Sequence, residues 1–222
     1  LTYANDVLRT KGSQMRTERQ FTQVGCELIG QADSVEGDIE VCMLALLGLK
    51  ALGIENITLD LTVPGIVNAL LDGVDDDVID YVLKSVSRRD VDVIAGYGLP
   101  QTDVLAQVMR ASGAAENALD VLASVKTPKL ITDSITRLKV VCEGVHAALN
   151  ELGITDVDLT IDMVEQDGFE YHKALGFTLF TKSLSGELGR GGCYDVRFGD
   201  DEAFETAKGF TLYMDTISRC VE

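Results

Sequence analysis

The residues best suited to bind a ligand lie on one face of a strand that we predict over residues 18–29. Side chains alternate across a strand, so Gln23 and Glu27 share a mostly polar face. A carboxylate accepts N–H donors from an ammonium or an imidazole, and an amide both donates and accepts. This pair therefore suits an amino-acid ligand.

The spacing of the pair restricts this interpretation. Four residues of straight strand span roughly 13 Å, which is too far for one small amino acid. Both side chains can reach the same ligand only if the strand bends, and Gly25 between them is where a bulge would be tolerated. From the spacing alone, a solvated sheet face is the simpler interpretation.

Other residues could assist binding, but no catalytic arrangement is visible. Arg9 and Arg19 lie near the pair in the predicted sheet and could contact an anion. Tyr171 and His172 are adjacent, but a lone histidine is more often structural, and no Cys, Ser or second His stands at motif spacing. The glycine-rich segment 189–192 lacks the Walker pattern, and we expect it to be a flexible turn between strands.

The elements that position these residues are predicted from periodicity. Alternation predicts strands over residues 3–10, 18–29, 56–63, 156–164 and 169–182, and residues 209–220 are expected to form a strand that turns into a helix. Helical spacing predicts helices over 37–52, 75–86, 101–111, 115–124 and 129–151. Strands that follow one another without crossover helices favour an α+β fold, an antiparallel sheet with helices on one side.

The change from strand-like to helix-like spacing of apolar residues divides the chain into three parts. Alternation disappears after the first strands and returns near residue 151, so the helices between form an inserted subdomain. We therefore predict a first core segment over 1–66, a helical insertion over 67–150 and a second core segment over 151–222.

Charge and cysteine content restrict the class of protein. The chain carries 36 acidic and 19 basic residues, a net charge of −17, which argues against a body that binds tRNA or DNA. Its five cysteines are scattered, odd in number and without a CxxC pair, as expected of reduced thiols in the cytoplasm rather than of a zinc site. No apolar run approaches the roughly 18 residues of a membrane span. We expect no metal and no cofactor.

Five ordered segments resemble the motifs of class II histidyl-tRNA synthetases. Residues 19–30 (RQFTQVGCELIG) resemble motif 2, and 7–12 (VLRTKG) resemble the strand before it. Residues 168–172 (GFEYH) and 191–195 (GGCYD) resemble the two histidine-specific motifs, usually RGLDYY and GGRYD. Residues 209–216 (GFTLYMDT) resemble motif 3. The resemblance covers nearly the whole chain and implies a class II synthetase-like antiparallel sheet flanked by helices, with a helical insertion between motifs 2 and 3.

The departures from these motifs bear on activity. Asp167, Cys193 and Thr216 stand where the synthetases carry arginines. Adenylation gathers negative charge from two anionic reactants, and losing one oriented cation typically costs about 10²-fold or more. We therefore expect no catalytic residues and no enzymatic activity, although the site could still hold histidine.

This pattern is similar to the regulatory subunits of short-form ATP phosphoribosyltransferase, which are synthetase-like proteins. The resemblance implies a partner catalytic subunit, histidine feedback on the first step of histidine biosynthesis, and a homodimer within a hetero-oligomer, with no tRNA and no membrane. The chain is expected to lack motif 1, since it opens inside a strand, and the anticodon-binding domain, since it ends after motif 3. A divergent or truncated histidyl-tRNA synthetase and a scaffold that binds no ligand are the alternatives.

The resemblance also assigns roles to residues. Glu27 would accept a hydrogen bond from the ligand imidazole, and Gln23 would meet its α-amino end. Tyr171, His172 and Tyr194 would line the imidazole pocket. Arg9 and Arg19 remain as anion contacts.

Overall fold

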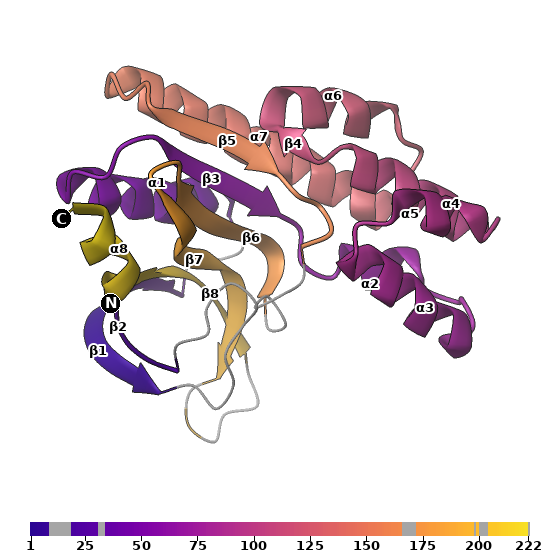
Figure 1. Ribbon diagram of the computed structural model, residues 1–222, viewed down its shortest axis with the longest axis horizontal. Helices are drawn as coiled ribbons and strands as arrows, with labels where there is room; N and C mark the ends of the chain where they lie inside the picture. The colour runs from indigo at the N-terminus through magenta and orange to yellow at the C-terminus, as the bar shows by residue number, and fades with distance from the viewer. Residues whose placement is uncertain (9–18, 31–33, 166–171, 198, 200–203, 222) are drawn as a thin grey trace.

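The structure is a computed structural model in which residues 1–8, 19–30, 34–165, 172–197, 199 and 204–221 are described. Their strands form one eight-stranded sheet in the order β1-β2-β8-β7-β6-β3-β5-β4 (Figure 1). The strands are β1 (Thr2–Leu8), β2 (Gln20–Ile29), β3 (Ile57–Thr62), β4 (Gly113–Ala114), β5 (Val157–Ile161), β6 (His172–Thr181), β7 (Leu184–Arg197) and β8 (Phe204–Tyr213). The α+β prediction is confirmed.

Eight helices are described alongside this sheet. They are α1 (Val35–Ala51), α2 (Ile66–Leu70), α3 (Asp76–Ser87), α4 (Val91–Gly96), α5 (Pro100–Arg110), α6 (Ala115–Ser124), α7 (Lys129–Glu151) and α8 (Met214–Val221). The Ser34 side chain caps α1 by accepting from Gly37 N, 3.1 Å away. Asp75 caps α3 and two aspartates follow it, as the acidic start of this helix predicted.

The register of the strands separates an apolar from a polar face. Cys26, Phe210, Phe177 and Leu61 lie in one cross-strand row and pack into the core. Helix α1 covers this face, and α7 packs on α1. The next row carries Tyr3, Gly25, Thr211, Arg190, Thr178, Asp60 and Thr160, and we call the side that it occupies the polar face.

The structure corrects three expectations. Strands β3 and β5 are parallel, because the chain between them returns through the helices α2–α7, as a parallel pair requires. Residues 189–192 are no turn but lie inside β7. The segment between β3 and β5 is not wholly helical, since β4 pairs with β5.

Helix α7 is tied to the sheet by a buried ion network. Asp38 on α1 bonds Lys208 Nζ at 2.7 Å and Arg137 of α7 through Nε at 2.7 Å. Asp38 and Lys208 are each 1% exposed. The core is continuous across the predicted boundaries at residues 66 and 150, and the division into three parts stays a prediction. Within the described residues, no helix is both long and apolar enough to cross a membrane.

Candidate functional site

A strip without side chains crosses the polar face. Glu27 pairs with Gly209, Gly209 with Gly192, Gly192 with Gly176, and Gly176 with Thr62. Cross-strand partners point to the same side of a sheet, so three neighbouring strands leave this row bare. We call Gly209, Gly192 and Gly176 the glycine strip. Glu27 stands at one end of it and Thr62 at the other.

The carboxylate of Glu27 lies over the first glycine of the strip. A Cβ on Gly209 would overlap Glu27 Oε2, so only glycine leaves room for this carboxylate. Tyr194 on β7 donates its hydroxyl to the same oxygen at 2.7 Å. Burial raises the pKa of Glu27, and the bond from Tyr194 offsets part of that rise. Glu27 is thus a fixed, half-buried acceptor for a ligand N–H.

His172 stands beside the second glycine. A Cβ on Gly192 would come within 2.5 Å of His172 Cδ2, so the imidazole occupies the space beside that glycine. His172 pairs with Tyr194 across β6 and β7, and their rings meet edge to face with centroids 6.3 Å apart. The structure therefore brings together three of the predicted residues, Glu27, His172 and Tyr194.

Gln23 is not brought to this group. The strand does not bulge at Gly25, where a bulge would be tolerated, because Gly25 pairs in regular register with Tyr3 on one side and Thr211 on the other. Its missing side chain makes room for the Tyr3 ring, which a Cβ would overlap. Tyr3 Oη lies 2.5 Å from Thr211 Oγ1. This pair stands between Gln23 and Glu27 on the polar face.

The predicted anion contacts are not seen at the strip. Arg19 is exposed at a bend before β2, eight residues from Glu27, which is roughly 26 Å of strand. Arg9 and Tyr171 lie outside the described residues, as does Asp167. Of the other substituted positions, Thr216 is buried in α8, where it keeps a neutral hydroxyl.

Cys193 bears on packing rather than on the ligand. It pairs with Lys208, whose ammonium bonds Asp38 of α1 under the helices. A side chain at position 193 therefore points away from the glycine strip. The replacement of the arginine of the second histidine-specific motif by Cys193 therefore does not change the charge of the polar face.

A cation that the sequence did not reveal stands near the strip. Arg190 lies on the polar face two residues before Gly192, and its Nε donates to Glu187. The side chains are 12% and 2% exposed. Burial lowers the pKa of Arg190, but the charge and hydrogen bond of Glu187 outweigh it, so the net shift is upward. An irregularity in β7, between the partners of Leu179 and Thr181, places the two residues together, which strict alternation does not predict.

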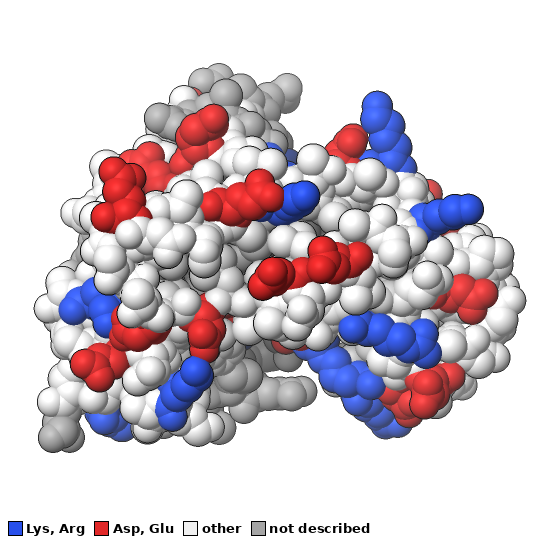
Figure 2. Space-filling model, turned by 90° about the horizontal axis from the view of Figure 1, so that it is seen from above, with Lys and Arg blue, Asp and Glu red and all other residues white. Residues whose placement is uncertain are grey.

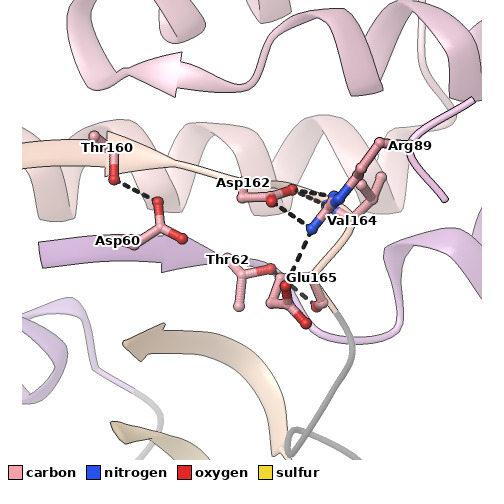
Figure 3. Close-up of polar contacts among 7 residues, drawn as sticks. All are labelled: Asp60, Thr62, Arg89, Thr160, Asp162, Val164 and Glu165. Carbon is pink, nitrogen blue, oxygen red and sulfur yellow. Dashed lines mark hydrogen bonds and ion pairs between the residues drawn. The ribbon is translucent and has the colours of Figure 1, made fainter. Parts of the chain in front are cut away.

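An acidic cluster lies at the other side of the polar face (Figure 3). Asp60 accepts a hydrogen bond from Thr160, and burial is the main cause that raises its pKa to about 6. Arg89, in the loop after α3, donates to Asp162 at 2.8 Å and to Glu165 at 3.1 Å. The guanidinium of Arg89 therefore faces the carboxylates of Asp162 and Glu165. The carboxylate of Asp60 lies close enough to this cluster for their charges to affect its pKa. No signal in the sequence marked Asp60.

The described part of this face offers acceptors rather than surplus positive charge. Arg190 is matched by Glu187, and Arg89 by two acids. Among the described residues, no group of three or more His, Cys, Asp and Glu is arranged to hold a metal. The arrangement can bind a small ligand that donates hydrogen bonds, and it lacks the excess of cations that would gather two anions.

Comparison with known proteins places this chain among the synthetase-like proteins. Residues 1–217 match the sequence model of a family described as histidyl-tRNA synthetase. The chain therefore belongs to the histidyl-tRNA synthetase family.

The particular relatives narrow the class further. The chain is 44% identical over its whole length to the ATP phosphoribosyltransferase regulatory subunit of Rhodospirillum centenum, and 37% identical over 98% of its length to that of Paramagnetospirillum magneticum. In both cases it covers 55% of the relative, so it spans about half the length of these proteins.

Two solved structures share the fold. One is an ATP phosphoribosyltransferase regulatory subunit/histidyl-tRNA synthetase from Bacillus halodurans, with a TM-score of 0.80 at 20% identity over 100% of this chain and 58% of that one. The other is the ATP phosphoribosyl transferase (HisG:HisZ) complex from Thermotoga maritima, with a TM-score of 0.70 at 18% identity over 96% and 72%.

Proposed function

We propose that this protein is a non-catalytic regulatory subunit of short-form ATP phosphoribosyltransferase, needed for activity and for histidine feedback in the first step of histidine biosynthesis. The names of its relatives at 44% and 37% identity support this assignment. The related complex from Thermotoga maritima supports a catalytic subunit as partner. We further propose that it works in the cytoplasm as a homodimer within the hetero-oligomer.

The observation that carries the proposal is the charge balance of the polar face. Adenylation needs cations aimed at ATP phosphates and at the ligand carboxylate. The described polar face pairs Arg190 and Arg89 with carboxylates and adds Asp60. Figure 2 shows acidic side chains spread over another face, with basic side chains gathered mainly toward one end of it. The net charge of −17 agrees with a function that needs no tRNA.

Histidine is the proposed ligand of the glycine strip. Glu27, held by Tyr194, accepts an N–H of the ligand imidazole, and His172 borders the bound ring. Gln23 is kept as a second contact only if Tyr3 moves, because the Tyr3–Thr211 pair separates it from Glu27. Tyr171, Arg9 and Arg19 stay predictions from the family resemblance.

Reconstitution tests the regulatory function. The protein is mixed with a short-form ATP phosphoribosyltransferase, and phosphoribosyl-ATP formation is followed with and without histidine. We expect activity well above that of the catalytic subunit alone, and inhibition by histidine that Glu27→Gln weakens. Failure to stimulate any short-form enzyme from a relative's species would refute the assignment.

A histidyl-tRNA synthetase is the second candidate, favoured by the family match over residues 1–217. An ATP–pyrophosphate exchange assay with histidine separates the two. We expect no exchange above background, and robust exchange would establish the enzyme instead.

A further inference from the structure

We propose that Arg89 is a positioning residue through which helices α3 and α4 hold the histidine site in its binding geometry. This inference deepens the proposed function and rests on it. Arg89 lies in the loop between α3 and α4, and its side chain reaches residues 162–165 after β5, which we call the acidic turn (Figure 3). Arg89 thus links these helices to the sheet that carries the glycine strip.

The backbone of Arg89 has a conformation that arginine adopts only at a cost. Its φ of 57° lies in the left-handed region, which favours glycine because glycine has no Cβ. Helix α3 ends at its C-cap Arg88, and Asp90 caps α4 by accepting from Val93 N, so residue 89 forms the corner between two helices. A glycine would suit this corner better, so the reason for an arginine lies in its side chain.

The guanidinium of Arg89 holds the acidic turn through a bidentate pair. Nη1 donates to Asp162 Oδ1 at 2.8 Å, and Nη2 lies 2.6 Å from Asp162 Oδ2. Nη2 also donates to Glu165 at 3.1 Å. A bidentate pair fixes orientation as well as distance, which the point charge of a lysine does not. Both ends of the turn are therefore fixed to the corner between α3 and α4.

The acidic turn is joined to the glycine strip by Thr62. The Thr62 hydroxyl donates to the carbonyl oxygen of Glu165 at 3.3 Å, and Thr62 pairs with Gly176, the last glycine of the strip. Along the chain, residues 166–171 connect the turn to His172, the first residue of β6. The turn thus contacts one end of the strip directly and is tied through the chain to the histidine beside it.

Charge repulsion gives the reason why the acidic turn would move without Arg89. Burial is the main cause that raises the pKa of Asp60, the charges of Asp162 and Glu165 raise it further, and the charge of Arg89 lowers it. Three carboxylates therefore share one guanidinium. Without that cation, their repulsion is relieved when the turn moves away from β3, which loosens the bond between the turn and Thr62.

Isothermal titration of the full chain with histidine tests this role. Arg89→Gly removes the side chain and suits the left-handed backbone, so this variant should unfold in urea at a midpoint near that of the wild type. Its dissociation constant for histidine should rise about 10-fold, a usual size for coupling between two parts of a protein. Arg89→Lys keeps the charge but not the bidentate geometry, and its affinity should lie between the two.

A matched control and a second measurement separate positioning from a general loss of stability. Arg88→Ala removes the same charge from the neighbouring exposed position and should leave histidine binding unchanged. Coupling is reciprocal, so a contact that strengthens histidine binding is itself strengthened by histidine. Bound histidine should therefore slow hydrogen exchange of the amides at the corner between α3 and α4 in the wild type, and not in Arg89→Gly.

Two results overturn this inference: histidine affinity in Arg89→Gly equal to that of the wild type, or hydrogen exchange at this corner that histidine leaves unchanged in the wild type. If Arg89→Gly does not fold, the titration of Arg89→Lys decides, and affinity equal to that of the wild type overturns the inference. Stimulation of the catalytic subunit by the wild type would still uphold the regulatory assignment. A wild type that neither stimulates that subunit nor binds histidine overturns both.

Discussion

Asp60→Asn should stabilise the protein at neutral and alkaline pH. Asp60 lies on the polar face near Asp162 and Glu165, and its pKa is raised from 3.8 to about 6. In the unfolded chain it ionises near pH 3.9, so between these values the folded state binds more protons and stability falls as the pH rises. Above about pH 6 Asp60 is ionised in the folded protein too, and the full loss of stability caused by its buried charge is present.

The magnitude follows from the shift. Two pKa units correspond to about 3 kcal/mol, which we take as an upper value, so a gain of about 1–3 kcal/mol is expected at pH 8. The asparagine oxygen can still accept from Thr160, and the other carboxylate oxygen is replaced by a neutral amide nitrogen of similar size. At pH 4 and below, where Asp60 is protonated in the folded protein, the gain should shrink toward zero.

Urea unfolding followed by circular dichroism at pH 4, 5, 6 and 8 measures this gain. Asp158→Asn, on the neighbouring strand β5 but 59% exposed and paired with Lys182, is the matched control and should change stability little. Two outcomes would refute the reasoning: an Asp60→Asn variant that is less stable than the wild type at pH 8, or a change in the free energy of unfolding that is the same at every pH. Either would show that the positive charge of Arg89 keeps Asp60 ionised in the folded protein.

Two further predictions concern the glycine strip and the ion network. Gly209→Ala should displace the Glu27 carboxylate, abolish histidine binding in a titration and lower the free energy of unfolding by about 1–3 kcal/mol. The control Gly96→Ala, where a Cβ meets nothing within 4 Å, should bind histidine normally. Unchanged histidine binding in Gly209→Ala would contradict the site. Asp38→Ala should cost about 3–5 kcal/mol in urea unfolding, because it leaves Lys208 buried without its carboxylate, and a loss under 1 kcal/mol would contradict this account.

Much of the local structure could be predicted because it depends on neighbours in the chain. Alternation located the main strands, helical spacing located α1, α3 and α7, and the aspartates at 75–77 marked the start of α3. The error at residues 189–192 has a physical cause. Glycines usually mark turns, but here they let side chains of neighbouring strands lie over the backbone in the middle of a sheet.

The sequence by itself determined the fold class, the polar side of β2 and the loss of three motif arginines, since each depends on residue type and short spacing. Only the tertiary structure decided that Gly209, Gly192 and Gly176 form one row, that Tyr3 separates Gln23 from Glu27, and that Arg190 stands beside the strip. The reason is register. Alternation fixes the face of a side chain within its own strand, but its neighbours depend on pairing between segments far apart in the chain.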